Sequence, residues 1–411
     1  MKKKKLIIIA SILILIILSV FGYFLYKYAM EEYFYDKYDL PKEAFITYSN
    51  KVNLFEDITY FDLITNKNVE ILNEDEKIDT ERTGRRTNTF DIKYNDKLYY
   101  YQMTVNVMDV TSPYVLSYFS TMTTKLFEPI YPCDNAVYLD DYDNKPTCTI
   151  DGDYNLTETG TYEVNYIFRD KAGNETIKPL KVNVVEKINS SKSNSSNYVT
   201  VPDYMDDIIN KYKTDKTMIG IDVSKWQGNI DFEKVKNAGV EFVIIRIGVQ
   251  AGKDYDYSLD GNYKTYIHDA KEAGLKVGVY VYSTALNFED GIKCGKWVLD
   301  NLAGEKLDLG ISYDWENYKW LMDYEVSIHD LNGAYRGFSS VIKSAGYEPH
   351  FYASKNYLEK LWLEIDEPVW LAHYTEKTNY QGKYFMWQMS SVGKVDGIPD
   401  NYVDIDILYL D

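Results

Sequence analysis

From Met218 to the end of the chain, short apolar segments alternate with amphipathic ones, and this alternation limits the possible folds more than any other feature. "MIGIDVSKW", "VEFVIIRIGVQ", "KVGVYVYSTA" and "LDLGISYDWEN" have the composition of buried strands. Segments of helical period separate them, such as "NYKTYIHDAKEAGL" and "SIHDLNGAYRGFSSVIKSAGY". Strands that alternate with helices predict parallel β/α units, and eight strand candidates predict a closed α/β (TIM-like) barrel over 218–411. Few helical segments follow residue 350, so the last part of this barrel should be irregular.

The segment before this barrel has a different pattern, which is typical of all-β domains. "LYYYQMTVNVMDV" and "GTYEVNYIFRDKAGNETIKPLKVNVVE" alternate large apolar and polar residues, as half-buried strands do. A plan of glycine, strand, turn and strand occurs twice, which predicts two tandem β-sandwiches at 39–110 and 111–186. The Ser/Asn-rich "KINSSKSNSSN" then predicts a flexible linker over 187–217, within which "VPDYMDDIINKYKT" either forms one short helix or extends the linker.

The N-terminus carries the pattern of a transmembrane segment. "MKKKK" precedes an uncharged apolar run from Leu6 to Tyr26, which as a helix would be roughly 32 Å long, against about 30 Å for a hydrocarbon core. The four lysines predict a cytoplasmic N-terminus. We therefore expect a single-pass signal anchor over 1–30 with the rest of the chain outside the cell membrane; a cleaved signal peptide is the alternative.

The chain has three cysteines. Cys133 and Cys148 lie in one β-rich segment at a separation that a disulfide can close, and an extracellular location would permit this bond. Cys294 falls within an expected helix and fits a small buried apolar residue better than a reactive thiol.

The net charge of −18 narrows the possible partners. Nucleic-acid binding calls for a basic stripe or patch, so the acidic balance argues against it. Binding should therefore depend on a shaped site.

Acidic residues stand at or near the expected C-terminal ends of three strands, where barrel enzymes place their chemistry. Asp222 follows "IGI", Asp314 and Glu316 follow "ISY", and Asp404 lies in "YVDIDIL". Residues i and i+2 of a strand point to the same face. We therefore expect Asp314 and Glu316 to enter one cavity, with Trp315 turned the other way.

Several carboxyls in one low-dielectric site split their pKa values, so that one keeps a proton while its neighbours ionise. Hydrolysis of a glycosidic bond needs such a pair. Aromatic side chains near the strand ends could stack on sugar rings: Tyr280, Tyr282, Tyr352, Trp370 and Trp387. A lone Asp-x-Glu also occurs at solvated strand ends, and clustered carboxylates can bind a metal. The chain has no His-Glu-x-x-His or Gly-x-Ser-x-Gly motif, and we expect neither a metal nor a cofactor.

Ordered motifs make 218–411 resemble the glycoside hydrolase family 25 lysozymes (muramidases): "GIDVSKWQGNIDF", "FVIIRIG", "GVYVYS", "YDWEN", "FYAS", "WLAHY", "WQMSSVGKVDGI" and "NYVDIDIL". The resemblance implies an irregular β/α barrel with Glu316 as proton donor and Asp314 as its carboxylate partner. It also implies that further acids and substrate-contacting side chains complete the site: Asp222, Asp404, Tyr280, Tyr352, Trp370, Trp387 and Gln388. Asp406 departs from the family pattern, which usually has asparagine there. Residues 111–186 resemble bacterial immunoglobulin-like (Ig-like) repeats, on "DVTSPYV" and "GTYEVNYIFRDKAGN".

These patterns predict a multidomain, membrane-anchored peptidoglycan hydrolase. Its substrate would be the glycan strand, cut at the β-1,4 bond between N-acetylmuramic acid and N-acetylglucosamine, with the catalytic domain facing the cell wall. Two alternatives remain open: a scaffold that binds wall glycan without turnover, and an adhesin that acts through its β-repeats.

Overall fold

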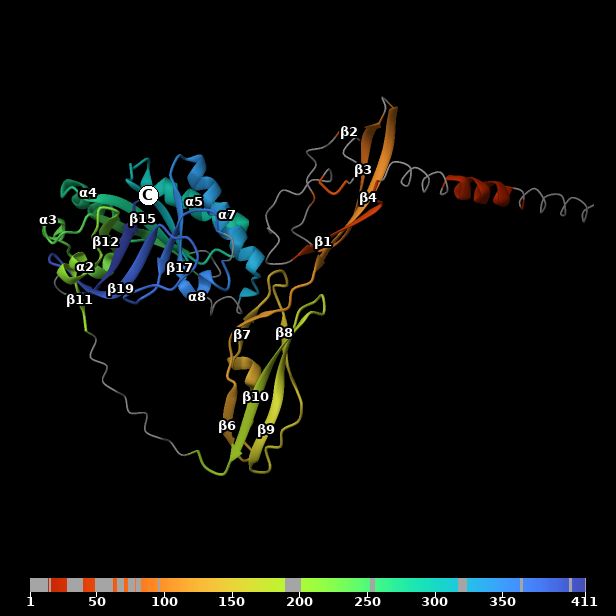
Figure 1. Ribbon diagram of the computed structural model, residues 1–411, viewed down its shortest axis with the longest axis horizontal. Coiled ribbons are helices and arrows are strands. Elements are labelled where there is room, and N and C mark those ends of the chain that lie inside the picture. The colour runs from red at the N-terminus through yellow and green to blue at the C-terminus, as the bar shows by residue number, and fades with distance from the viewer. Residues whose placement is uncertain are drawn as a thin grey trace, which may run out of the picture. The chain divides into compact units, whose positions relative to one another are not determined.

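The computed structural model describes residues 14, 16–27, 40–48, 62–64, 70–72, 78, 83–94, 97–188, 201–251, 256–316, 324–362, 365–398 and 401–410. By their contacts, they divide into two compact units, Met1–Val110 and Thr111–Asp411. Figure 1 labels their helices and strands.

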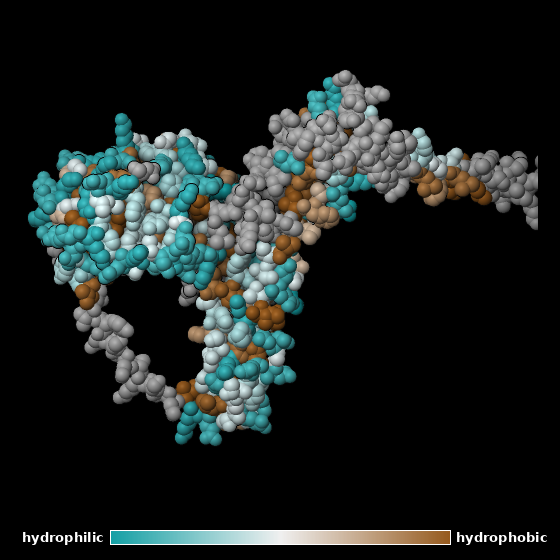
Figure 2. Space-filling view, in the orientation of Figure 1, coloured by the Kyte–Doolittle hydropathy of each residue, from teal (hydrophilic) through white to brown (hydrophobic). Residues whose placement is uncertain are grey.

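Residues 16–27 of the expected anchor are helical and exposed. Their large apolar side chains, among them Phe21 and Phe24, form the apolar stretch near the N-terminus in Figure 2. Within the described residues, we find no helix that is both long enough and apolar enough to cross a membrane. Residues 1–13, 15 and 28–30 of the expected anchor lie outside the described residues.

The β-rich part of the first unit is one four-stranded sheet in the order β1-β4-β3-β2. Its strands are β1 (Glu43–Tyr48), β2 (Glu70–Ile71), β3 (Gly84–Tyr94) and β4 (Lys97–Asp109). Tyr101, Met103 and Val105 are fully buried at every second position of β4, as the period-2 pattern predicts. The described residues of this unit contain one sheet instead of the two that the expected sandwich over 39–110 requires.

Residues 111–186 form two sheets around an apolar core. The larger has the order β6-β10-β9-β8, and β5 pairs with β7. The strands are β5 (Tyr114–Ser117), β6 (Thr121–Lys125), β7 (Val137–Leu139), β8 (Thr147–Asp151), β9 (Gly160–Arg169) and β10 (Glu175–Val185). Cys133, in the short helix η1 (Pro132–Asn135), and Cys148 of β8 are joined in a disulfide with an S–S distance of 2.04 Å. The Ig-like identity of this domain stays a prediction.

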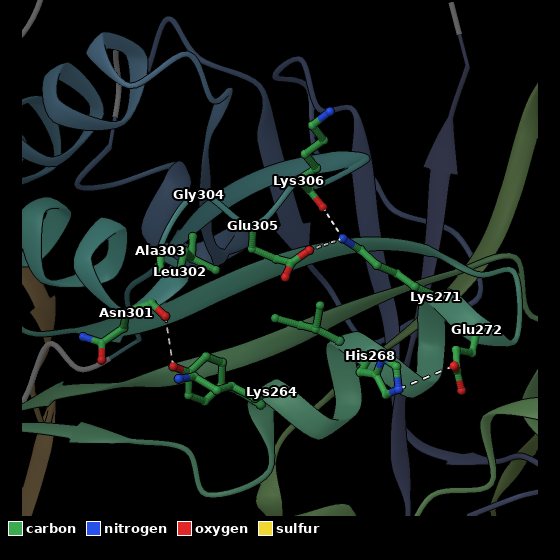
Figure 3. Close-up of a pocket in the computed structure, with 12 residues that line it drawn as sticks. Lys264, His268, Lys271, Glu272, Asn301, Leu302, Ala303, Gly304, Glu305 and Lys306 are labelled. Atoms are coloured by element: carbon green, nitrogen blue, oxygen red, sulfur yellow. Dashed lines mark hydrogen bonds and ion pairs between the residues drawn. The ribbon is translucent and has the colours of Figure 1, made fainter.

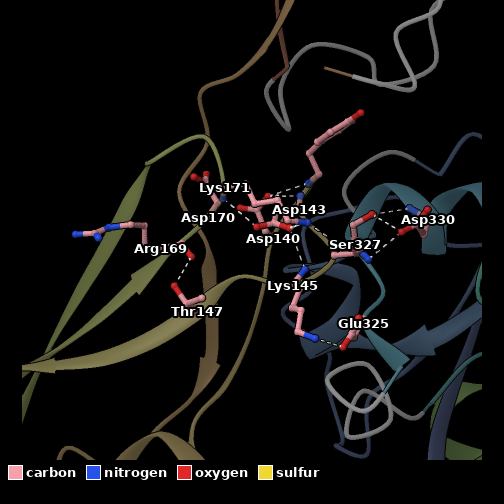
Figure 4. A network of polar contacts seen from close by, with 12 residues as sticks. Asp140, Asp143, Lys145, Thr147, Arg169, Asp170, Lys171, Glu325, Ser327 and Asp330 are labelled. Atoms are coloured by element: carbon pink, nitrogen blue, oxygen red, sulfur yellow. Dashed lines mark hydrogen bonds and ion pairs between the residues drawn. The ribbon is translucent and has the colours of Figure 1, made fainter. Parts of the chain in front are cut away.

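The loop after β7 contacts the start of helix α7 (Ile328–Ser344), which belongs to the same unit (Figure 4). The N–H groups of Ile328 and His329 donate to the carbonyls of Asp140 and Asp141, both at 2.9 Å. Ser327 and Asp330 complete a reciprocal capping box at this end. Since the first N–H groups of a helix have no partner within it, these contacts fix where α7 begins.

The second half of the expected linker over 187–217 is not a flexible linker, and it contains the short helix that the sequence left open. β11 (Asp203–Tyr204) pairs with β19 of the barrel, and α2 (Met205–Tyr212) follows it directly. Met205 and Ile208 are buried in the barrel's core because the short helix "MDDIINKY" is amphipathic. Residues 189–200 of the expected linker lie outside the described residues.

Eight strands close into the predicted barrel, shown in Figure 1. In order around the ring they are β12 (Thr217–Val223), β13 (Phe242–Ala251), β15 (Lys276–Ser283), β16 (Leu309–Asp314), β17 (Pro349–Ser354), β18 (Val369–Ala372), β19 (Met386–Lys394) and β20 (Val403–Tyr409). Neighbours are parallel except β20, which pairs antiparallel with both β12 and β19. The additional strand β14 (Asp256–Leu259) pairs with β13.

The helices cover the barrel unevenly, as the sequence predicts. α3 (Phe232–Asn237), α4 (Tyr263–Glu272), α5 (Phe288–Leu302) and α7 follow the early strands, with the short η2 (Lys225–Gln227) after β12. After β17, the only helix among the described residues is the four-residue α8 (Lys355–Leu358). α5 and α7 pack backbone to backbone, since a Cβ on Gly291 would lie 1.8 Å from the carbonyl oxygen of Ala334.

The barrel has two apolar clusters, one on each side of its wall. The larger fills the space between the strands and the helices. The smaller, which includes Phe242, Trp370 and Met386, occupies the interior of the ring. Side chains of successive residues alternate between these two regions, so position along each strand decides which residues reach the site.

Candidate active site

The four predicted acids come together at one end of the barrel. Asp222 of β12 lies directly opposite Asp404 of β20 in the strand register. Asp314 ends β16, and Glu316 follows two residues later. Each of these acids interacts electrostatically with at least two of the others. The strands therefore bring together side chains that are up to 182 positions apart (404 − 222 = 182).

The "YDWEN" segment places its two acids and its tryptophan on opposite sides of the wall. Asp314 is 5% exposed, and Glu316 is exposed at the C-terminal end of the barrel. Trp315 is 1% exposed and packs edge-to-face against Tyr357 and Trp362 in the outer cluster, with ring centroids 5.1 and 5.4 Å apart. This arrangement is the one that the i, i+2 spacing predicts.

The side chain of Gln388 forms hydrogen bonds with one of the acids, Asp222, and with two tyrosines. Its Nε2 donates to Oδ2 of Asp222 at 2.8 Å. Its Oε1 accepts from the hydroxyl groups of Tyr352 at 2.8 Å and Tyr374 at 3.0 Å. With both hydroxyls directed at the carbonyl oxygen, the amide is oriented so that its N–H faces the carboxyl group.

Arg246 is the cation next to the acids. Its Nε and Nη2 donate to Oδ2 of the buried Asp260 at 3.1 and 3.0 Å, which fixes the guanidinium on the interior of β13. The positive charge lowers the pKa values of Asp314 and Glu316, against the larger effect of burial.

Burial raises the pKa of every acid in the cluster, and repulsion from neighbouring acids raises the pKa values of the three aspartates further. The pKa of Asp314 is raised well above its ordinary value by burial first, then by Glu316 and Asp222. Burial also raises the pKa of Glu316, but this side chain is open to solvent, which weakens that effect. Burial and the charges of Asp222 and Glu316 raise the pKa of Asp404 to about 8. The cluster therefore keeps protons at neutral pH.

The raised pKa of Asp404 predicts that the barrel loses stability as pH rises. An unfolded aspartate has a pKa of 3.8, while the folded group binds its proton up to about pH 8. The stabilisation is thus complete below about pH 4 and is lost as pH rises through about 8. We expect the melting temperature to fall over this range, and Asp404→Asn to make the fall shallower. The same substitution at the exposed Asp300 is the control, and an equal effect at both positions would contradict the assignment.

The predicted sugar-stacking residues do not all lie at the acids. Tyr282 lies opposite Asp314 in the register and is half-buried. Tyr280, Tyr352 and Trp370 lie in the interior beneath the acids, where their rings contact one another. The expectation that Trp387 stacks on a sugar ring is corrected, because its side chain faces the outer cluster and packs against Tyr212. Because Gln388 points inward, the preceding residue of the strand must point outward.

A cavity of about 870 Å³ lies elsewhere, along α4 and against the end of α5 and the residues that follow it (Figure 3). None of the four acids lines it. Its charged groups pair with one another, as Lys271 does with Glu305 at 2.6 Å and His268 with Glu272 at 3.5 Å. It is therefore not a competing site for the acid chemistry.

The sequence reasoning missed two side chains of the site, Arg246 and Tyr374. Both fall inside segments already singled out, "FVIIRIG" and "WLAHY". A single arginine within an apolar strand is a signal, because an unpaired buried cation is costly and so predicts nearby acids.

Comparison with known proteins gives one family for this part of the chain. Residues 221–398 match the model for glycosyl hydrolases family 25. The chain is similar to the autolytic lysozyme of Clostridium acetobutylicum, with 32% identity over 192 residues, 46% of this chain and 55% of the relative. It is also similar to lysozyme M1 of Streptomyces globisporus, with 26% identity over 198 residues, 44% of this chain and 64% of the relative. The chain thus spans less than two thirds of either relative.

Among solved structures, a family 25 glycosyl hydrolase from Bacillus anthracis aligns with a TM-score of 0.42 and 19% identity, over 49% of this chain and 93% of that one. The sequence match thus makes residues 221–398 similar to the glycosyl hydrolases of family 25.

Proposed function

We propose that the chain is a membrane-anchored peptidoglycan hydrolase that cleaves the β-1,4 bond between N-acetylmuramic acid and N-acetylglucosamine. The observation that carries this proposal is the acid cluster at the C-terminal end of the barrel. Glu316 meets solvent there, and Asp314 beside it is buried and coupled to it by charge. A reacting sugar can therefore reach one acid while the other supports it from below.

The two acids divide the reaction between them. Glu316 gives its proton to the glycosidic oxygen as the bond from that oxygen to the anomeric carbon breaks. Asp314, as a carboxylate, stabilises the positive charge that develops on the sugar ring, and water completes the hydrolysis. In the free site, burial favours the retained proton on Asp314 more than on Glu316. The reactive state of the pair is the one in which this proton is on Glu316, the member open to solvent, and Asp314 is ionised.

The similar proteins support the choice of substrate. Both curated relatives are named lysozymes, and their matched segments of 192 and 198 residues are about as long as the barrel domain. The absence of a basic excess does not weaken the proposal, since a tethered enzyme has a raised effective concentration at the wall.

The proposed location rests on the N-terminal sequence. The apolar run from Leu6 to Tyr26 follows four lysines, and the side chains described within it are exposed. Exposed apolar residues of this kind are stable in lipid and not in water. The N-terminal segment would then lie in the cell membrane, and the β-domains would hold the barrel on the side of the membrane that faces the wall.

Mass spectrometry of peptidoglycan digested by the full chain tests the proposal. We expect fragments that end in reducing N-acetylmuramic acid. Reducing N-acetylglucosamine ends would assign the cut to the other bond. Binding to purified walls without any new reducing ends would favour a glycan-binding scaffold, and binding that persists without residues 218–411 would favour an adhesin.

A further inference from the structure

Asp406 lies one layer deeper in the barrel than the acids that meet solvent. In the antiparallel pair of β12 and β20, Asp222 faces Asp404, and Asp406 faces Gly220. The three aspartates share the interior face because directly opposed residues, and residues two apart, point to the same side. On its other side, Asp406 lies opposite Gln388 of β19. It is fully buried.

The two oxygens of Asp406 have different environments. Oδ1 accepts a hydrogen bond from Nε1 of Trp370 at 2.8 Å. Oδ2 is buried, and no fixed N–H or hydroxyl donor reaches it among the described residues. The carboxyl of Asp222 interacts with the carboxyl of Asp406 as a side-chain hydrogen-bonding partner. A buried carboxylate oxygen without a donor is costly, so a proton between the two carboxyls is the arrangement that satisfies both.

The surroundings decide which carboxyl carries the proton. Asp222 faces the charges of Asp406 and Glu316, and its interactions with Asp314 and Asp404 also oppose ionisation. Asp406 faces one further acid, Asp404, and its charged form accepts the Trp370 hydrogen bond. The amide of Gln388 favours a charge on Asp222, but it is a single neutral donor against several like charges. The cation Arg246 and the hydroxyls of Tyr280, Tyr352 and Tyr374 complete the surroundings.

We propose that Asp222 and Asp406 share one proton, which Asp222 carries and donates to Oδ2 of Asp406, so that the pair holds its single negative charge one layer below Glu316 and Asp314. Asp406 is then a positioning residue, which acts on the site through Asp222. The inference rests on the proposed function only in its effect on catalysis, because the shared proton itself is a property of the folded barrel.

Asparagine at 406 would reverse this arrangement. Its amide group would donate to Asp222 and stabilise that residue as a carboxylate. The negative charge would then stand beside Glu316 instead of below it, and the pKa of Glu316 would rise. The aspartate thus keeps the proton donor at a lower pKa than asparagine would.

Infrared spectroscopy of the full chain in detergent at neutral pH measures the shared proton directly. Protonated and ionised carboxyl groups absorb in separate regions, so Asp406→Asn should remove one protonated carboxyl from the wild-type spectrum. Asp300→Asn, at an exposed position of α5, is the control and should leave the absorption of the protonated carboxyls unchanged.

Burial also raises the pKa of Asp406 itself, so the double variant Asp222→Asn/Asp406→Asn is needed to count the protons. It should lose one protonated and one ionised carboxyl. Loss of an ionised carboxylate in Asp406→Asn, or loss of two protonated carboxyls in the double variant, would overturn the proposal. Should Asp406→Asn fail to fold, Asp222→Asn must also lose one protonated group, because its amide donates to Asp406 in place of the acid.

The pH dependence of kcat/KM tests whether Asp406 affects the pKa of Glu316. We expect the alkaline limb of the profile to move up by about one pH unit in Asp406→Asn and to stay in place in Asp300→Asn. An unmoved limb together with the infrared loss would show that the proton is shared without effect on Glu316, which contradicts the positioning role. If the wild-type chain hydrolyses no peptidoglycan, the proposed function fails, while the infrared result still decides whether the proton is shared.

Discussion

Replacing Glu316 with glutamine is expected to reduce the release of reducing sugar from purified walls by about 10²–10⁴-fold, the usual contribution of a placed general acid. Glutamine keeps the size of the side chain and its place after Asp314, but it has no acidic proton to give to the glycosidic oxygen. The fall should appear in kcat, because the proton is transferred only in the transition state. Binding of the variant to walls should be close to that of the wild type.

Glu376→Gln is the matched control for this experiment. Its side chain is 86% exposed, and its ion pair with Lys211 is a surface contact that contributes little. It should hydrolyse walls at the wild-type rate. If Glu316→Gln also kept that rate, another group would be the acid. The half-buried Asp404, whose pKa of about 8 holds a proton at neutral pH, would then be the next residue to test.

Local sequence patterns predict the parts of the site that depend on a single strand. The spacing of Asp314, Trp315 and Glu316 gives the side of the wall that each faces, and the structure agrees. The same alternation shows that Trp387 and Gln388 cannot both point to the interior, although both fall in one motif. Assigning both to the site ignored a rule that the sequence already supplies.

Other features depend on the register between distant strands, which no local pattern contains. The pairing of β12 with β20 places Asp406 below Asp222, although 184 positions separate them (406 − 222 = 184). Shifting that register by one residue would turn Asp406 outward. The sequence leaves open whether α2 forms, because Ser/Asn-rich residues precede it and its few apolar side chains become buried only when β11 pairs with β19.

Trp315→Ala is expected to lower the free energy of unfolding of the barrel by about 3–5 kcal/mol, the usual cost of removing a fully buried tryptophan. The ring packs against Tyr357 and Trp362, so its loss leaves a cavity behind the strand end that carries the two acids. Urea unfolding followed by tryptophan fluorescence measures this change in the full chain. All seven tryptophans lie between Trp226 and Trp387, so the signal reports on the barrel alone.

Trp226→Ala is the control for this change, because the Trp226 side chain is 68% exposed. Removing it should change the free energy of unfolding by no more than about 0.5 kcal/mol. Each of the two variants lacks one tryptophan, so their fluorescence signals can be compared. A loss in Trp315→Ala as small as in Trp226→Ala would mean that Trp315 is not buried behind the acids. Since Asp314 and Glu316 are directed inward only if the residue between them is directed outward, that result would also remove the basis for assigning both acids to one site.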